Sequence, residues 1–182
     1  YYSHYPFDDK KANSICPTYY KHIQNKIKDF PNTPLLIITS ARYFSLPIVT
    51  EEEKQKNLAG MKQAYKEFSV GRTLFITYPI PVNLKADPKA MSRDLLFKRT
   101  TLKDEYNQPI EEVFAKYQGL REHQKLISEK LNLNILDPMK YLCNDKYCYG
   151  SKNGRPLYYD GAHLSEYGNK LLVPMFEEIF KK

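Results

Sequence analysis

Three short, nearly all-apolar runs alternate along the chain with longer stretches of helical periodicity. The apolar runs cover residues 35–39, 73–78 and 133–136, and the helical stretches cover residues 17–30, 51–70, 109–130 and 164–180. A short apolar run bounded by turn residues is typical of a parallel strand that is covered on both faces. Helical crossovers between such strands predict right-handed βαβ units. We therefore expect an α/β fold around a parallel sheet, from which one or two N-terminal strands are missing.

Prolines and glycines mark the expected ends of these elements. Pro31 ends the first helix, and Gly71 separates the second helix from the strand that follows. Pro174 lies inside the closing helix and indicates either a local kink or a helix that does not extend through this position. Residues 83–108 have no clean period, so we expect a long irregular segment there with a short helix at 91–99. Long loops in compact domains are often functional.

Length and composition fit one domain over residues 1–182. A hydrophobic fraction of 42% and a charged fraction of 27% are ordinary for a globular protein. No run approaches the roughly 18 apolar residues that a membrane span needs. The chain opens on Tyr1 without Met or a recognisable leader, so we expect it to be part of a longer protein.

The net charge of +7 comes from Lys and Arg residues spread over every predicted helix. This spread argues against nucleic-acid binding, which favours a clustered basic face. A solvated basic surface is the simplest explanation, although weak attraction to an acidic envelope polymer or a membrane surface stays open. The 16 Tyr residues and absence of Trp are unusual. Tyr is favoured where sugars bind, but most of these side chains should pack in or beside the core.

Two of the three cysteines, Cys143 and Cys148, lie close together in a turn-rich segment and could close a short disulfide loop. A loop of this length is worth about 2 kcal/mol, which is enough to pin a loop but not to hold a fold. Cys16 is then without a partner. In an oxidising compartment its partner would lie upstream of Tyr1, whereas the alternative is a reduced thiol in a cytosolic protein.

The most informative segment is residues 156–168, which read Pro-Leu-Tyr-Tyr-Asp-Gly-Ala-His-Leu-Ser-Glu-Tyr-Gly. In a turn, the Asp160 carboxylate can accept a hydrogen bond from one ring nitrogen of His163, so that the other nitrogen faces outward. A serine nucleophile needs this arrangement: the histidine removes its proton, and the aspartate fixes the tautomer and stabilises the imidazolium. The alternative is that Asp160 or Ser165 caps the last helix and that His163 is a packed or surface residue.

The whole string resembles the last conserved block of the SGNH/GDSL esterases. Its Tyr-x-Asp-x-x-His-Leu-Ser-x-x-Gly form is similar to SGNH domains attached to membrane acyltransferases that O-acetylate bacterial surface polysaccharides. Further features resemble those domains in the same order: the Cys16 helix, Ser40-Ala-Arg42-Tyr at a strand end, Tyr-Pro-Ile-Pro81 after a strand, and the Cys143 and Cys148 pair before Gly-Arg-Pro-Leu-Tyr158. The resemblance covers nearly the whole chain from Cys16 onward and implies a three-layer α/β/α fold.

Two departures from the family pattern concern the nucleophile and the oxyanion hole. No Gly-Asp-Ser occurs, and Ser3 stands too close to Cys16 to leave room for the strand and helix between them. We therefore expect the nucleophile to lie outside this chain. Ser40 is a much less favoured substitute. The Gly-x-Asn-Asp block is also missing. Arg42 stands at the comparable strand end, where it could donate to the oxyanion or pair with a carboxylate as a structural residue.

The resemblance implies acyl transfer, of acetyl in particular, to or from a carbohydrate hydroxyl by a Ser-His-Asp mechanism. His163 would be the base and Asp160 its orienting partner, while Tyr158, Tyr159 and Arg42 would line the site. Neither a metal nor an organic cofactor is implied. The partners would be a glycan acceptor, an acyl donor and an attached transmembrane acyltransferase domain, with this domain facing the periplasm or cell exterior. The chain by itself should be nearly inactive without its serine.

Two other function classes remain. A glycan-binding module that has lost catalysis would also explain the missing Gly-Asp-Ser, and an upstream Gly-Asp-Ser block would exclude it. Basic nucleic-acid binding predicts a clustered cationic face and steep salt dependence. His22 and His123 lie in predicted helices without ligands at metal spacing, so we interpret them as surface residues. Asp137 is expected to cap a strand end.

Overall fold

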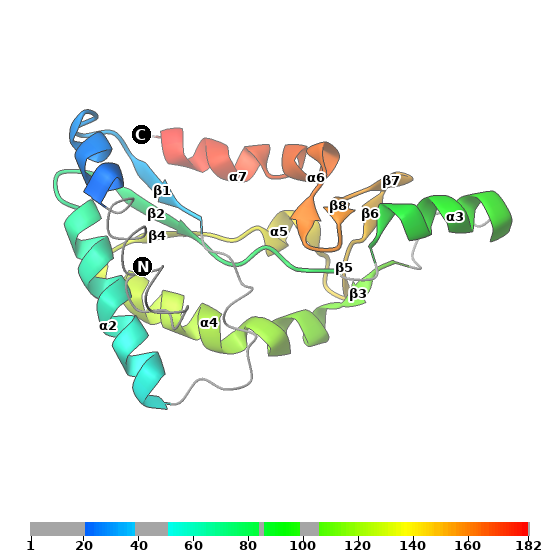
Figure 1. Cartoon of the computed structure of the whole chain (residues 1–182), viewed down its shortest axis with the longest axis horizontal. Coiled ribbons are helices and arrows are strands. Elements are labelled where there is room, and N and C mark those ends of the chain that lie inside the picture. Colours follow the sequence, from blue (N-terminus) through cyan, green and yellow to red (C-terminus); the bar gives the residue numbers. More distant parts are fainter. Residues whose placement is uncertain (1–20, 39–50, 84–85, 99–105, 182) are drawn as a thin grey trace. The chain divides into compact units, whose positions relative to one another are not determined.

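The computed structural model describes residues 21–38, 51–83, 86–98 and 106–181 (Figure 1). The predictions for Cys16, Ser40 and Arg42 lie outside these residues. The described chain divides into two compact units: one holds residues 21–37, 51–76 and 122–135, and the other holds residue 38 and residues 77–83, 86–98, 106–121 and 136–181. The expectation of one domain over 1–182 stays a prediction.

A three-stranded parallel sheet confirms the predicted α/β architecture. Its strands are β1 (Leu35–Ile37), β2 (Leu74–Thr77) and β4 (Asn134–Leu136), which lie side by side in the order β1-β2-β4 (Figure 1). Leu35 lies opposite Leu74, and Ile37 lies opposite Ile76. All four residues of the central strand β2 are buried, as expected for an apolar run that is covered on both faces.

The helices of the first unit follow the predicted positions. Residues 21–28 are helical, α2 spans Glu51–Phe68, and the second half of α4 (Ile110–Leu131) belongs to this unit. The Arg72 guanidinium donates to the carbonyls of Ile27 and Phe30 at 3.2 and 3.3 Å. These carbonyls lie at the end of the first helix, where carbonyl groups lack regular helical partners; the Ile27 carbonyl also accepts from the N–H of Phe30 at 3.2 Å. Gln24 donates to Glu67 of α2 at 3.0 Å, which joins the two helices.

The second unit contains short strand pairs that the sequence pattern did not predict, together with the short helix that was predicted at 91–99. Three antiparallel pairs form among the described residues: β3 (Gln108–Pro109) with β5 (Tyr147–Cys148), β6 (Ser151–Lys152) with β7 (Arg155–Pro156), and β8 (Tyr158–Asp160) with β9 (His163–Leu164). The helices α3 (Pro88–Lys98) and α5 (Met139–Leu142) and the first half of α4 also belong to this unit. Strands this short carry no detectable alternation of apolar and polar residues.

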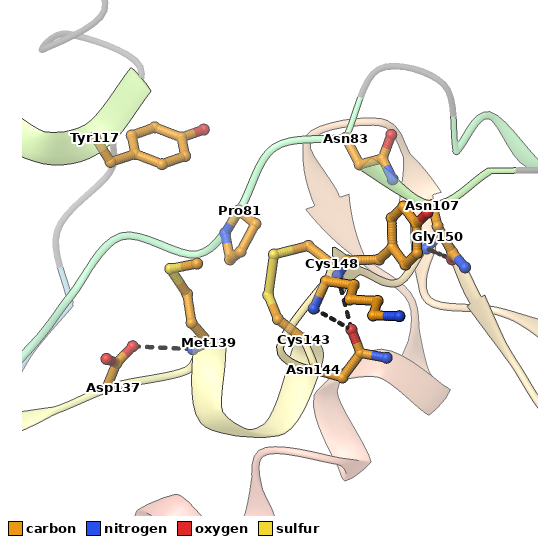
Figure 2. The surroundings of a disulfide bond; sticks show 12 residues. Pro81, Asn83, Asn107, Tyr117, Asp137, Met139, Cys143, Asn144, Cys148 and Gly150 are labelled. Atoms are coloured by element: carbon orange, nitrogen blue, oxygen red, sulfur yellow. Dashed lines mark hydrogen bonds between the residues drawn. A yellow bond between two sulfur atoms is a disulfide. The ribbon is translucent and has the colours of Figure 1, made fainter. Parts of the chain in front are cut away.

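The predicted disulfide between Cys143 and Cys148 is confirmed (Figure 2). Cys148 belongs to a buried cluster formed with Val113, Tyr117, Leu120 and Met139. Figure 2 shows the loop between the cysteines turning at Asn144, whose side-chain oxygen accepts from the N–H groups of Lys146 and Tyr147 at 2.9 and 2.7 Å. The disulfide therefore fixes a polar turn against the first half of α4.

The predicted single closing helix over 164–180 is wrong. Figure 1 shows two separate coils there, α6 (Glu166–Lys170) and α7 (Val173–Glu177), and a 3₁₀ turn follows at Glu178–Phe180. Pro174 lies in the first turn of α7, where its missing N–H leaves no intrahelical bond unmade. A continuous helix would need that N–H to reach the carbonyl of residue 170. The proline thus marks a new helix start.

Candidate active site

The predicted pair Asp160 and His163 lies on the β8–β9 hairpin. The two residues are opposite each other in the antiparallel register, and Gly161 and Ala162 form the turn between them. The Asp160 side chain accepts from the backbone N–H groups of His163 at 2.8 Å and of Ala162 at 3.1 Å. This is an aspartate turn, in which the side chain holds the backbone two or three residues further on. These two backbone bonds fix the carboxylate independently of its bond to the imidazole.

The imidazole of His163 binds this carboxylate through one nitrogen. Its Nδ1 lies 2.9 Å from both carboxylate oxygens of Asp160. A neutral imidazole that donates from Nδ1 carries its lone pair on Nε2, which can then accept a proton. Within the described part of the chain, the His163 side chain hydrogen-bonds to Asp160 alone. The side chain is 76% exposed, so Nε2 is open to a partner or substrate.

The electrostatics of the pair favour an ionised carboxylate. The hydrogen bond from the His163 side chain is the largest influence on Asp160, followed by the His163 backbone N–H, and together they hold the pKa of Asp160 below its ordinary value. An ionised aspartate beside Nδ1 stabilises the imidazolium that forms when Nε2 takes a proton. The pair can therefore serve as a general base.

Two long-range bonds anchor the hairpin within its own unit. The hydroxyl of Tyr158 donates to the carbonyl of Pro81 at 2.8 Å, and the backbone N–H of Asn83 donates to the carbonyl of Gly161 at 2.8 Å. The Asn83 side chain in turn donates to the carbonyl of Tyr106 at 2.7 Å. Pro81 and Asn83 lie on the segment that leaves β2 (Figure 2). Sequence reasoning missed Asn83, whose only signal is its place two residues after the Pro-Ile-Pro segment.

The two tyrosines that were expected to line the site have different surroundings. Tyr158 is fully buried, and burial raises the pKa of its hydroxyl, which stays a neutral donor. Tyr159 is 76% exposed and directly precedes Asp160, so it is accessible to a ligand. Tyr158 therefore holds the hairpin through its buried hydroxyl. Contact between Tyr159 and a substrate stays a prediction. The oxyanion donors proposed at Ser40 and Arg42 lie outside the described residues.

The helix that follows the hairpin explains the rest of the motif. The Ser165 hydroxyl accepts from the N–H of Gly168 at 3.0 Å and donates to the carbonyl of Pro156 at 2.8 Å. Ser165 thus caps α6, as one alternative interpretation expected, while Asp160 serves His163 instead. A Cβ atom on Gly168 would collide with the carbonyl oxygen of Leu157. The motif therefore needs serine and glycine because α6 packs closely behind the β8–β9 hairpin.

The other candidates from the sequence have different positions. His22 is exposed on the first helix, and His123 is half-buried on α4. The Asp137 carboxylate pairs with Arg121 at 2.8 Å and accepts from the N–H of Met139 at 3.0 Å, which starts α5. The described residues contain no group of three or more His, Cys, Asp or Glu side chains that could hold a metal ion. None of the described helices is long and apolar enough to span a bilayer.

Arg121 is a further residue that the sequence did not single out. Its guanidinium lies 3.9 Å from the ring centroid of Tyr78 and 5.1 Å from that of Phe114. Together with the ion pair to Asp137, these contacts enclose the cation on several sides. Both terminal nitrogens of the guanidinium are bonded within the fold, so we assign Arg121 a structural role.

Comparison with known protein families identifies the architecture around this site. Residues 1–178 match the family described as "SGNH domain (fused to AT3 domains)". No curated protein and no solved structure matched the chain. Such a domain suggests a serine hydrolase or esterase type of enzyme with an acyl-transfer or hydrolase role, as an extracytoplasmic part of a membrane protein. The disulfide is compatible with that location. The chain belongs to the family of SGNH domains that are fused to AT3 domains.

Proposed function

We propose that this domain transfers an acyl group, acetyl in particular, to or from a hydroxyl of a cell-surface glycan by a Ser-His-Asp mechanism. The observation that carries the proposal is the His163 imidazole, which is bonded to a fixed Asp160 carboxylate through Nδ1 and is open at Nε2. The domain would work at the periplasmic or extracellular face, beside an attached transmembrane acyltransferase domain that presents the acyl donor.

The chemistry follows from the geometry of the pair. Nε2 of His163 would remove the proton of a serine hydroxyl as the serine oxygen attacks the acyl carbonyl. The imidazolium, stabilised by Asp160, would return that proton to the departing group when the tetrahedral intermediate collapses. A sugar hydroxyl would then attack the acyl-enzyme to complete transfer, whereas water would complete hydrolysis. Arg42 is the proposed donor to the oxyanion.

The serine is proposed to come from outside the residues that the structure describes. In that part of the chain, Nε2 of His163 has no serine partner, and the family's Gly-Asp-Ser sequence does not occur in the 182 residues. An upstream Gly-Asp-Ser block is the favoured source, and Ser40 is the candidate within the chain. Without its serine, a triad retains only a small remainder of its rate.

The test is acetyl transfer by membranes that contain the protein in its natural sequence context. The initial rate of labelled acetyl incorporation into surface polysaccharide would be compared for the wild type, His163→Ala, Asp160→Asn and the control His22→Ala, which removes an exposed imidazole far along the sequence. Loss of either pair member should lower the rate by about 10³- to 10⁴-fold, and the control should not change it. Wild-type rates in both site variants would refute the mechanism.

A catalytically inactive glycan-binding module is the second candidate. The missing Gly-Asp-Ser sequence favours it, and Tyr159 offers an exposed ring beside the pair. This candidate predicts that the wild-type membranes transfer no acetyl through the domain although the purified chain binds glycan. The two candidates are therefore separated by the same acetyl-transfer measurement combined with a binding measurement.

A further inference from the structure

The β6–β7 hairpin places two cations directly opposite each other. Lys152 pairs with Arg155 in the antiparallel register, and the turn between them uses Asn153 and Gly154, whose φ angles are 52° and 71°. Two successive residues with positive φ form the tight turn that suits the twist of a hairpin. Like charges at opposed positions destabilise a strand pair. Repulsion between Lys152 and Arg155 therefore destabilises this hairpin locally.

Each of these cations rests on a tyrosine ring. The Arg155 guanidinium lies 4.5 Å from the ring centroid of Tyr167, and the Lys152 ammonium lies 5.5 Å from that of Tyr149. The Asn153 side chain donates to the Tyr167 hydroxyl at 3.3 Å and so holds the ring that supports Arg155. A guanidinium stacked on a ring is oriented before a ligand arrives. The Arg155 guanidinium is thus held over the Tyr167 ring.

The donors of this guanidinium are unused within the described part of the chain. Arg155 forms no hydrogen bond or ion pair there, and its side chain is exposed. The Glu166 carboxylate, whose pKa is lowered first by Lys170 and also by the charge of Arg155, is paired with Lys170 at 2.6 Å. A planar fork of free N–H groups matches the two oxygens of a carboxylate or a phosphate. Arg155 is therefore ready for an anion.

This cationic hairpin lies close to the Asp160 and His163 pair. The Pro156 carbonyl, next to Arg155, accepts from Ser165, which is two residues from His163. Tyr167 is four residues from His163, so their Cα atoms are at most about 14 Å apart. A polymer bound at His163 could reach the hairpin with a neighbouring sugar.

We propose that Lys152, Arg155 and Tyr167 form a subsite that binds an anionic group of the glycan, a sugar carboxylate or phosphate, beside the sugar whose hydroxyl is acylated. The Arg155 fork binds the anionic oxygens, Lys152 adds a second positive charge, and the half-buried ring of Tyr167 contacts the sugar. This inference rests on the proposed function, because it names the class of acceptor. The net charge of +7 would attract such a polymer from a distance.

The test measures binding of defined polymers to the purified chain by isothermal titration. The probes are polygalacturonate for sugar carboxylates, poly(glycerol phosphate) for phosphates, and neutral dextran. Arg155→Gln should weaken binding of the preferred anionic polymer by about 10- to 100-fold, as expected for a charge-assisted bidentate bond. The matched control is Arg93→Gln, which removes the same charge from an exposed position on α3 and should weaken binding by less than about 2-fold.

A third variant, Arg155→Lys, keeps the charge but removes the planar fork, and it should weaken binding nearly as much as Arg155→Gln. If Arg155→Gln does not fold, the binding affinity of Arg155→Lys tests the subsite in its place. Equal effects of the Arg155→Gln and Arg93→Gln substitutions would overturn the subsite in favour of unspecific attraction. Binding of dextran as tight as that of the anionic polymers would also overturn the subsite.

The binding test is independent of the acetyl-transfer test. The control His22→Ala should leave polymer binding unchanged, because His22 belongs neither to the subsite nor to the pair of Asp160 and His163. If binding depends on Arg155 while acetyl transfer does not depend on His163, the subsite stands and the proposed mechanism falls. If transfer depends on His163 but binding is insensitive to Arg155, the mechanism stands and the subsite falls.

Discussion

Replacing Tyr158 by Phe tests whether this tyrosine anchors the hairpin or contacts the substrate. The hydroxyl of Tyr158 donates to the buried Pro81 carbonyl at 2.8 Å, and the residue is 0% exposed. The substitution removes one oxygen without opening a large cavity, so the expected cost is that of a carbonyl left without its partner. That cost is about 1–3 kcal/mol. Because the hydroxyl bonds a buried backbone carbonyl, we expect Tyr158→Phe to lower the free energy of unfolding by this amount.

The assay is urea unfolding of the purified chain. At a slope of about 2 kcal/mol per M, the midpoint should fall by about 0.5–1.5 M while the slope stays constant. Tyr159→Phe makes the same chemical change on a neighbour that is 76% exposed, and it should move stability by less than about 0.5 kcal/mol. Equal midpoints for the two variants would refute the anchoring role. A change in acetyl transfer by Tyr158→Phe at wild-type stability would support the predicted substrate contact instead.

Four further substitutions or treatments concern the same unit. Gly168→Ala should cost about 1–3 kcal/mol, because its Cβ would collide with a backbone carbonyl. Gly119→Ala in α4, where a Cβ meets nothing within 4 Å, should raise the free energy of unfolding by about 0.5–1 kcal/mol. A urea-unfolding midpoint that is higher for Gly168→Ala than for Gly119→Ala would contradict the packing. Reducing the disulfide should cost about 2 kcal/mol and leave the far-ultraviolet circular dichroism intact; loss of that signal would show that the bond holds the whole fold. Because His163 lowers the pKa of Asp160, the ionised carboxylate stabilises the fold above about pH 4, and this stability is lost as the pH falls through the lowered folded-state pKa. The unfolding free energy of the wild type minus that of Asp160→Asn should therefore shrink on acidification, and a constant difference would exclude the linkage.

The parts of the fold that the sequence predicted are those with a repeating pattern. The runs at 35–39, 73–78 and 133–136 became the strands of the parallel sheet, each within a few residues of the predicted bounds. The long helix predicted at 109–130 begins one residue later, at Ile110. Runs of this kind are predictable because apolar burial repeats along them. The sequence pattern alone therefore identified the sheet and the helices that accompany it.

The parts that were missed depend on single contacts between distant residues. The bond from Tyr158 to Pro81 spans 77 positions, and no local period reports such a bond. The strands of the hairpins are two or three residues long, which is too short for alternation to show. The closing helix was wrong because the periodicity of 164–180 was given more weight than Pro174. The backbone rule for proline was the better guide there.

The candidate site was predictable to a different extent for each residue. Asp160 and His163 were identified because residues 156–168 resemble the last conserved block of the SGNH/GDSL esterases, and the structure brings the two side chains together. Asn83 was missed, because its part is a backbone N–H that any residue but proline could supply. The side-chain bond of Asn83 to a backbone carbonyl likewise has no signature in the sequence.

The shortness of the β8–β9 hairpin has a consequence for how the site behaves in time. A two-stranded hairpin is marginal by itself, and this one is retained by bonds from Tyr158, Asn83 and Ser165 to neighbouring segments. Segments held by so few bonds open locally at a free energy below that of global unfolding. Warming should therefore release the hairpin first and reduce the fraction of molecules with an assembled pair. Catalytic activity would then decline at temperatures where the parallel sheet is still intact.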